Sequence, residues 1–459
     1  MEKEEIISTL NEQRRFFESG VTLDIDYRLE MLRKLRSLVV KYEHELIDAM
    51  WKDFHKPEFE VIASETRLVI LELNHTIRNL RSWAGKKRVR SPLVHFLSWS
   101  YIRPQPYGQV LILSPWNFPF QLAFIPLVGA LAAGNCVIMK MSQQVPNTMA
   151  VMEKLLENMP KGLVTMINGD HTISDFLLEH NFDYIFFTGS PKIGRHVMKK
   201  AAENLVPLSL ELGGKNPCVV ASDARLDYAA RRIAWGKFLN GGQTCVAPDY
   251  VLVDKKVKTR FLENIKREID GFYRGNPQNS NHLCGVLNQE NVTRLSLLMN
   301  KGTIVTGGIT DRESCYVSPT VLADVKPSDP VMEQEIFGPL LPVIEFEKPE
   351  DVYDIINQHP KPLATYIFTS DRKYLREFMS KTQSGTVAIN DTVIQFVSPH
   401  LPFGGIGPSG LGRYHGRKSF ETFSNMRSVI RKSNLFDIPL RYAPYTKIKT
   451  NIIKRILSL

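Results

Sequence analysis

The sequence predicts an α/β protein built on parallel sheets. Short apolar runs alternate with amphipathic stretches from residue 109 onward, and a second alternation of the same kind follows residue 215. The composition of the 459-residue chain is that of an ordinary globular protein, with 43% apolar and 23% charged residues. Such sheets bind ligands at the carboxyl ends of their strands, so we expect the functional residues there.

The predicted elements follow in order along the chain. The first ~80 residues predict helices, since apolar side chains recur near i, i+3, i+4 and i+7, most clearly over 28–54. The first α/β layer then predicts strands and helices in alternation: strands over 110–113, 136–139, 163–167 and 183–187, with helices over 120–133 and from about 146 and 192. The second layer predicts strands over 216–220, 250–253 and 341–346, with helices over 225–239 and 257–271. No linker separates the layers, so a short, packed boundary is expected.

The formal net charge of +10 is concentrated in two segments. Residues 431–459 carry seven Lys or Arg against one acid, and residues 85–107 carry five basic residues and no acid. Because the body of the fold is not basic, we expect no nucleic-acid partner. The favoured interpretation of both segments is solvated surface, with an anionic membrane or an acidic partner as the alternative.

The cysteines and the N-terminus predict a cytoplasmic protein. The five cysteines are odd in number and scattered, which fits neither a disulfide framework nor paired zinc ligands. Residues 1–20 mix charged and apolar residues at helical spacing, unlike a signal peptide. No run reaches the ~18 apolar residues that a spanning helix needs. Peripheral membrane attachment through the basic C-terminal tail stays open beside the cytoplasmic prediction.

A glycine turn follows the strand predicted over 183–187. Gly189, Ser190 and Gly194 lie where that strand passes into a helix, so the backbone can approach a phosphate at the helix N-terminus. The spacing is not the G-x-G-x-x-G of common dinucleotide folds. A plain strand-to-helix connection explains the turn equally well.

Two polar residues stand at the ends of apolar strands. Asn117, between Trp116 and Phe118, would be a rigid amide donor suited to an oxyanion, although a cap for the following helix is the favoured local interpretation. Glu211 lies where an apolar strand passes into two glycines, so a semi-apolar setting would raise its pKa and make it a base. A lone glutamate is more often a surface charge.

Cys245 follows Gly241 and Gly242 in the stretch NGGQTCVAPDY. The glycines allow a turn that brings the Cys245 thiol and its backbone N–H to one point, as acyl transfer requires. Taken alone, a free cysteine is more often a buried core residue.

The combination of these features carries more weight than each alone. In one chain and one order stand Asn117, the Gly189/Gly194 turn, Glu211, Cys245, EQEIFGP at 333–339 and LPFGGIGPSGLGRYHGRKSFETFSN at 401–425. Together they closely resemble the aldehyde dehydrogenase superfamily over nearly the whole chain. The segment YHGRKSFETFSN and the nearby chain end resemble class 3, the branch of fatty and aromatic aldehyde dehydrogenases.

The resemblance implies oxidation of an aldehyde to the carboxylate by three residues. Cys245 matches the nucleophile that forms a thiohemiacetal and then a thioester. Asn117, with the Cys245 backbone N–H, matches the oxyanion site, and Glu211 matches the base that activates water for hydrolysis. Splitting the oxidation into covalent steps lowers each barrier.

The resemblance also implies NAD or NADP as cofactor. The residues matched to it are Lys140 for the adenosine ribose, Gly189, Ser190 and Gly194 for the pyrophosphate turn, and Glu335 and Phe337 for the nicotinamide end. One departure concerns the ribose: the family's Lys-Pro-Ser-Glu reads KMSQ here, which leaves Gln143 in place of a glutamate. Without that carboxylate a 2′-phosphate meets no repulsion, so we expect NADP to be accepted.

An aldehyde dehydrogenase-like architecture is implied as well. It has a Rossmann-type cofactor domain at 1–84 and 108–210, a catalytic α/β domain at 211–391, and a bridging or oligomerisation segment with the C-terminal tail at 85–107 and 392–459. The family analogy implies a homodimer. For the tail, disorder or a dimer contact is favoured over weak peripheral membrane contact.

Two other functions remain as alternatives. A CoA-acylating relative or a thiol acyltransferase would pass the thioester to another thiol, which the presence of Glu211 disfavours. A non-enzymatic binder of anionic surfaces would leave the whole constellation unexplained. The substrate is expected to be a medium- or long-chain aliphatic or an aromatic aldehyde, because several aromatic residues are candidates for the pocket: Trp51, Phe54, Trp116, Phe118 and Phe396.

Overall fold

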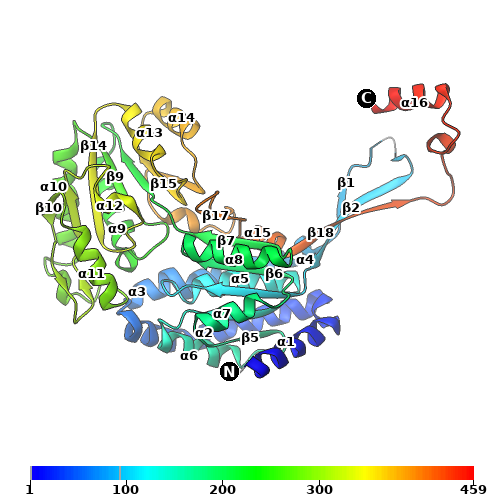
Figure 1. Ribbon diagram of the computed structural model, residues 1–459, viewed down its shortest axis with the longest axis horizontal. Helices are drawn as coiled ribbons and strands as arrows, with labels where there is room; N and C mark the ends of the chain where they lie inside the picture. The colour runs from blue at the N-terminus through cyan, green and yellow to red at the C-terminus, as the bar shows by residue number, and fades with distance from the viewer. Residues whose placement is uncertain (1–2, 93–94, 459) are drawn as a thin grey trace.

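The computed structural model describes residues 3–92 and 95–458. Two parallel α/β sheets, each covered by helices, form the body, and a narrow arm extends from it (Figure 1). The mixed α/β class predicted from the sequence is confirmed.

The first sheet has six strands in the order β17-β7-β6-β3-β4-β5. Its members are β3 (Gln109–Ser114), β4 (Cys136–Met141), β5 (Val164–Met166), β6 (Tyr184–Gly189), β7 (Leu208–Leu212) and β17 (Gly410–Leu411). All neighbours are parallel except β17, which runs antiparallel to β7. The strands predicted over 110–113, 136–139, 163–167 and 183–187 are β3, β4, β5 and β6.

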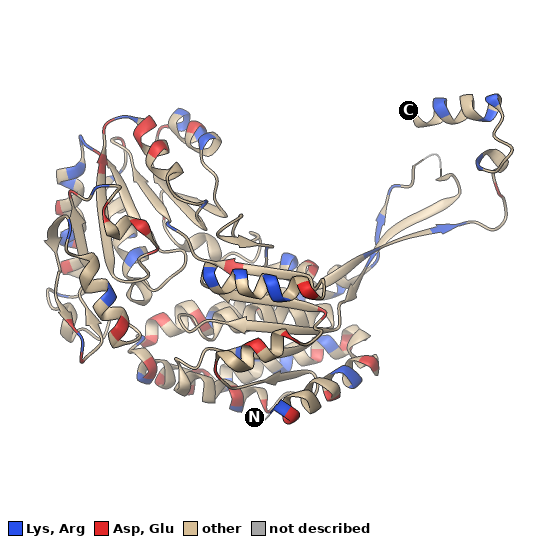
Figure 2. Cartoon of the chain, viewed as in Figure 1, with Lys and Arg blue, Asp and Glu red and all other residues tan. Residues whose placement is uncertain are grey.

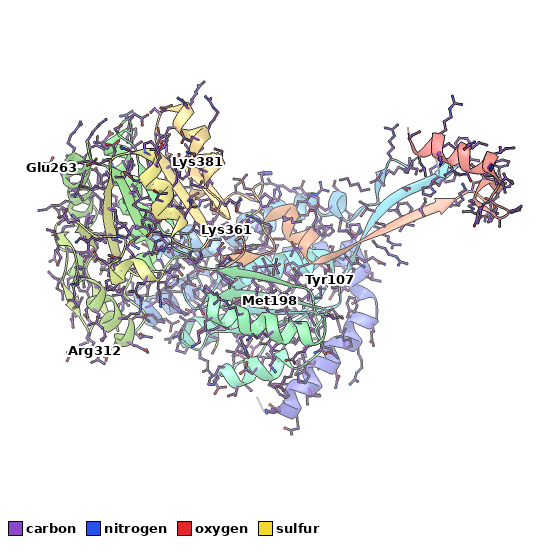
Figure 3. All side chains as sticks on the ribbon, turned by 45° about the horizontal axis from the view of Figure 1, so that its top comes forward. Tyr107, Met198, Glu263, Arg312, Lys361 and Lys381 are labelled. Atoms are coloured by element: carbon purple, nitrogen blue, oxygen red, sulfur yellow. The ribbon has the colours of Figure 1, made fainter. Side chains whose placement is uncertain are left out.

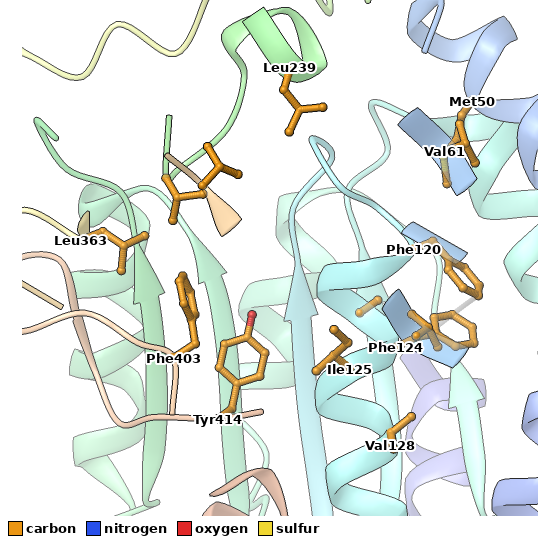
Figure 4. Packing of buried hydrophobic residues seen from close by; sticks show 14 of the residues in the cluster. Met50, Val61, Phe120, Phe124, Ile125, Val128, Leu239, Leu363, Phe403 and Tyr414 are labelled. Atoms are coloured by element: carbon orange, nitrogen blue, oxygen red, sulfur yellow. The ribbon is translucent and has the colours of Figure 1, made fainter. Parts of the chain in front are cut away.

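Alternate side chains of these strands bury against helices on opposite faces. Leu111 and Ile185 point to a cluster covered by α1 (Lys3–Glu18), α7 (His171–Leu178) and α8 (Pro191–Glu203). Ile112 and Phe186 point to the larger cluster, which continues into the second sheet. On the side of the first sheet it contains residues of the helices α2 (Ile25–Phe54), α4 (Arg67–Ala84), α5 (Gln121–Ala133), α6 (Pro146–Leu156) and α15 (Gly416–Thr422). Figure 4 shows part of this core, with Phe120 and Phe124 stacked 4.1 Å apart.

The second sheet has seven strands in the order β10-β13-β14-β9-β8-β15-β16. They are β8 (Pro217–Val220), β9 (Tyr250–Asp254), β10 (Thr303–Thr306), β13 (Thr320–Ala323), β14 (Leu340–Phe346), β15 (Ala364–Phe368) and β16 (Thr386–Ile389). Only β10 runs antiparallel to its neighbour. The helices of this layer are α9 (Leu226–Phe238), α10 (Lys258–Phe272), α11 (Gln289–Leu298), α12 (Pro330–Glu333), α13 (Pro349–Asn357) and α14 (Arg372–Lys381), and a small ribbon joins β11 (Thr310–Asp311) to β12 (Tyr316–Val317).

The arm is an antiparallel sheet of β1 (Lys87–Val89), β2 (Ser98–Pro106) and β18 (Ser424–Lys432). Figure 3 places Tyr107 at its base, and Figure 1 shows α16 (Lys447–Leu457) beyond its far end. Lysine and arginine residues occur in both the arm and α16 (Figure 2). Within the predicted segment 392–459, β17 and α15 belong to the first sheet and its helices, and only β18 joins the arm. The domain boundaries stay a prediction.

Two findings bear on the environment of the protein. All five cysteines are free thiols, and those at 136, 218 and 284 are buried. Across residues 3–92 and 95–458, no helix has the length and apolar character required to cross a bilayer.

Candidate functional site

The Cys245 loop begins with three residues in left-handed conformation. Helix α9 ends at Phe238, and Asn240, Gly241 and Gly242 follow with φ of 56°, 61° and 74°. A Cβ on Gly242 would lie 2.2 Å from the carbonyl oxygen of Gly338, so only glycine fits. The turn expected from the two glycines is present, and it closes the loop tightly around the cysteine.

Asn117 is hydrogen-bonded to this loop. Its Nδ2 donates to the carbonyl oxygen of Gln243 at 3.0 Å, and Asn240 Nδ2 donates to the carbonyl oxygen of Asn117 at 2.8 Å. The Asn117 side chain does not cap the next helix, because α5 begins at Gln121 without a side-chain cap. The local interpretation of Asn117 as a cap is therefore wrong.

Cys245 is half-buried, whereas the residues on either side of it are buried. Burial, together with the nearby carboxylates of Glu335 and Glu211, raises the pKa of its thiol to about 12, and the N–H groups of Cys245 and Val246 oppose this rise. The resting sulfur is therefore a protonated thiol at neutral pH.

Glu211 is a buried carboxylate without a hydrogen-bond partner on either oxygen among the described residues. Burial raises its pKa well above the ordinary value, and the positive charge of Arg413 opposes this rise. Strand β17 covers it, with Gly410 paired to Glu211, and a Cβ on Gly404 would lie 2.9 Å from its Oε1. Glu211 is therefore not a surface charge, and its basicity is that of a desolvated carboxylate.

Glu335 lies against Gly213 and Gly214, the two glycines that follow strand β7. A Cβ on Gly213 would come within 2.1 Å of Glu335 Oε2, and the Gly214 N–H donates to the carboxylate. Burial raises the pKa of Glu335 to about 8, and the charge of Asp249 adds to the rise. Phe337, with a φ of 47°, packs edge-on against Trp116 at 5.6 Å between ring centroids.

A cavity of about 820 Å³ opens at the carboxyl ends of β3, β4 and β6. Lys140, Gln143, Gly189 and Ser190 line it, and Ser190 caps α8 by accepting from the Ile193 N–H at 3.4 Å. The Lys140 ammonium has no hydrogen bond or ion pair within the described parts of the chain, and burial lowers its pKa.

This arrangement fits a dinucleotide, since an unpartnered ammonium and a helix N-terminus both face the cavity. Gly194 does not line it. A Cβ there would meet Leu212 at 2.6 Å, so this glycine lets α8 pack closely on β7.

A second cavity, of about 490 Å³, lies beside the first residues of the Cys245 loop. Most of its walls are apolar, including Phe59, Trp235, Leu239, Val393, Ile394 and Phe396. Of the five aromatic residues proposed from the sequence, Phe396 lines this cavity and Trp116 lines the larger one. Phe54 and Phe118 are buried, and Trp51 is exposed.

The sequence interpretation missed several residues that hold the site. Asn240 and Glu60 are buried and bonded to each other, with the Asn240 N–H 2.9 Å from Glu60 Oε2. Lys237 is also buried, near Asp249, and burial lowers its pKa to about 8. Acids and a lysine inside otherwise apolar helices, as in EFEVIASE and AWGKF, were the available signal.

Comparison with known proteins gives concordant matches. Residues 1–429 match the aldehyde dehydrogenase family. A relative from Mus musculus, aldehyde dehydrogenase family 3 member B2, is 41% identical over 443 residues, which cover 95% of this chain and 92% of the relative.

Two solved structures are similar to this fold. The substrate-bound state of Staphylococcus aureus AldH superposes with a TM-score of 0.96 at 38% identity, covering 98% of this chain and 99% of the other. PnpE in complex with nicotinamide adenine dinucleotide has a TM-score of 0.86 at 27% identity, covering 95% of this chain and 92% of the other.

Proposed function

Because the chain belongs to the aldehyde dehydrogenase family, which oxidises aldehydes to acids with NAD or NADP, we propose that Cys245, Asn117 and Glu211 carry the reaction. The observation that carries this assignment is the pair of hydrogen bonds between Asn117 and the Cys245 loop. In addition, the unpaired carboxylate of Glu211 is close enough to raise the pKa of the Cys245 thiol. These contacts support a site in which the nucleophile, the oxyanion donor and the base act on the same carbonyl group.

Cys245 Sγ attacks the aldehyde carbon, and the oxygen becomes an alkoxide. Asn117 Nδ2 has two hydrogens, of which one is donated to Gln243, so the other remains for this oxyanion. The Cys245 backbone N–H is the second donor. A nicotinamide cofactor, held by the residues that line the cavity with Lys140 and Ser190, would accept the hydride, and a thioester would remain on sulfur.

Two proton transfers need a base. As the carbon–sulfur bond forms, the thiol must release its proton to solvent water, because its raised pKa keeps it protonated at rest. Water must then lose a proton as it attacks the thioester. Glu211 serves the second step: it is desolvated and unpaired, so its raised pKa makes it a strong carboxylate base.

The first experiment is a turnover assay with hydrophobic aldehydes and either cofactor, in the presence and absence of CoA. We expect reduced cofactor and free carboxylic acid at the same rate with and without CoA. Acyl-CoA as the main product would instead establish the acylating alternative. No reduced cofactor with any aldehyde would refute the proposed function.

Cofactor preference is proposed to depend on Gln143. This exposed side chain lines the cofactor cavity where the family has a glutamate, so the carboxylate that would repel a 2′-phosphate at this position is absent. We expect NADP to be used well, and Gln143→Glu to lower kcat/KM for NADP by about 10-fold or more while NAD is kept, on the scale of one close charge pair. Gln278→Glu, at an exposed glutamine that does not line this cavity, is the control. A strong NAD preference that Gln143→Glu leaves unchanged would contradict the proposal.

The apolar cavity is proposed as the aldehyde-binding cavity. It adjoins the start of the Cys245 loop at Leu239, and its aromatic and aliphatic walls suit medium- or long-chain aliphatic or aromatic aldehydes.

We also propose a cytoplasmic location, consistent with five free thiols.

The arm is proposed to join two copies of the chain. Its outer strands β1 and β18 leave open sheet edges, and Trp99 and Ile430 are exposed on it. We expect sedimentation to give twice the chain mass of 52.4 kDa. Combined Trp99→Asp and Ile430→Asp should yield monomers, while Leu205→Asp, on an exposed part of the body, should not. A monomeric wild type would exclude the dimer.

Weak membrane contact is proposed for α16. None of its described residues is buried, and the exposed Ile448 and Ile452 stand near Lys449 and Arg455 in the sequence. Flotation with phosphatidylserine vesicles should show binding that high salt removes, and vesicles of phosphatidylcholine alone should not bind. Equal recovery with both lipids would contradict it.

A further inference from the structure

Glu60 brings an acid into the wall of the apolar cavity. It lies in α3 (Glu58–Val61), which continues into the π-helical turn η2 (Ile62–Thr66), and its side chain is 9% exposed. Oε2 accepts from the backbone N–H of Asn240 at 2.9 Å. Because Asn240 begins the left-handed turn of the Cys245 loop, this bond fixes the carboxylate relative to the nucleophile.

Within the described residues, no lysine, arginine or histidine forms an ion pair with Glu60. Lys56, whose charge lowers the pKa of Glu60, is buried and forms its ion pair with Glu65 at 2.6 Å. Glu65 in turn accepts from the backbone N–H groups of Phe120 and Gln121, at 3.2 and 2.8 Å. The second oxygen of Glu60, Oε1, has no hydrogen-bond partner among the described residues. The charge of Lys56 is thus divided between two acids, and one carboxylate charge remains in excess.

The other walls of the cavity do not neutralise this charge. Among the described lining residues, Glu60 is the single acid, and neither lysine nor arginine is present. The remaining titratable groups are Tyr273, a neutral phenol whose pKa burial raises, and His282, which is exposed. Burial raises the pKa of Glu60 to about 7. Above pH 7 the cavity therefore presents a negative charge within apolar walls, where the effective dielectric constant is low.

We propose that Glu60 is a specificity-determining residue that makes the cavity select uncharged aldehydes over aldehydes that carry a carboxylate. The proposal rests on the assignment of this cavity to the aldehyde. A carboxylate on the substrate would lose its water shell and meet the fixed charge of Glu60, whereas an uncharged chain or ring meets only apolar walls. Selectivity thus comes from repulsion of the wrong substrate.

The test compares 4-formylbenzoate with its uncharged methyl ester, at pH 8.5 and with the preferred cofactor. For the wild type we expect kcat/KM to be at least about 10-fold lower for the acid than for the ester. Glu60→Gln keeps an oxygen acceptor for the Asn240 N–H and removes the charge. This variant should reduce the ratio of kcat/KM for the ester to kcat/KM for the acid by about 10-fold, while kcat/KM for the ester itself changes by less than about 3-fold.

Glu58→Gln is the matched control, because Glu58 is an exposed acid of the same short helix that does not line the cavity. It should leave this ratio unchanged. The proposal would be overturned if the ester-to-acid ratio of kcat/KM in Glu60→Gln stayed within 2-fold of the wild-type ratio. It would also be overturned if Glu58→Gln reduced that ratio as much as Glu60→Gln does. Failure of the wild type to oxidise the ester with either cofactor would instead refute the proposed function.

A second measurement does not depend on the variant folding. Benzoate and benzamide have similar size and differ in charge, so their inhibition constants against the wild type report the same repulsion. Benzamide is expected to inhibit at least about 10-fold more strongly than benzoate. Equal or stronger inhibition by benzoate would overturn the proposal.

Discussion

Replacing Cys245 by serine is expected to lower kcat for aldehyde oxidation by about 10³-fold or more, without loss of the fold or of cofactor binding. A serine hydroxyl has nearly the size of the thiol but is a far weaker nucleophile at neutral pH. The loop itself does not depend on the sulfur, since Asn117, Asn240 and Gln243 hold it through amide and backbone groups.

Three measurements check this expectation: the rate of cofactor reduction, the dissociation constant of NAD or NADP, and the thermal midpoint. Cys315→Ser is the control, because Cys315 is a partly exposed thiol that packs against the core of the second sheet. It should retain wild-type rates. More than about one tenth of wild-type activity in Cys245→Ser would mean that Cys245 is a packing residue.

Replacing Glu211 by glutamine is expected to separate acylation from hydrolysis. The first turnover should still release about one reduced cofactor per chain as a burst, and the steady rate should fall by about 10²- to 10⁴-fold. The side chain keeps its volume against Gly404 and β17, so the change removes the base with little disturbance of packing.

The pH dependence of the wild type follows from the same residue. Burial raises the pKa of Glu211. As the pH rises through this raised pKa, the ionised carboxylate becomes more populated, so kcat should rise. In Glu211→Gln this rise should disappear, while Glu203→Gln, at an exposed glutamate of α8, should keep it. Loss of the burst together with the steady rate would show that Glu211 acts before the thioester forms.

The fold was predictable where strands are buried on both faces. Strands β3, β4 and β6 are continuous apolar runs because helices cover both sides of the sheet. The arm gave no such signal: β2 reads SWSYIRPQP, with two prolines and no buried residue, and its assignment came from the family resemblance alone. Strand β15, although fully buried, was not predicted.

The site was predictable only in part, because its environment is assembled from distant segments. Locally, Glu211 looked like a surface charge, and the strand that buries it, β17, comes from much later in the chain. Glu60 and Asn240 are separated by 180 positions, so no spacing rule relates them. The family motifs identified the candidate residues, and the structure supplied their hydrogen-bond partners.

The pairing of β17 with β7 has a consequence for synthesis of the protein on the ribosome. Glu211 stays on an open sheet edge, in contact with water, until residues 404–413 have emerged and been placed over it. The late segment is anchored at the same time, since Asn135 Nδ2 donates to the carbonyl oxygen of Phe423 and Glu72 accepts from the Gly416 N–H. With Glu211 as the proposed base, we therefore expect nascent chains that end before residue 404 to lack hydrolytic activity, although they already contain Cys245 and Asn117.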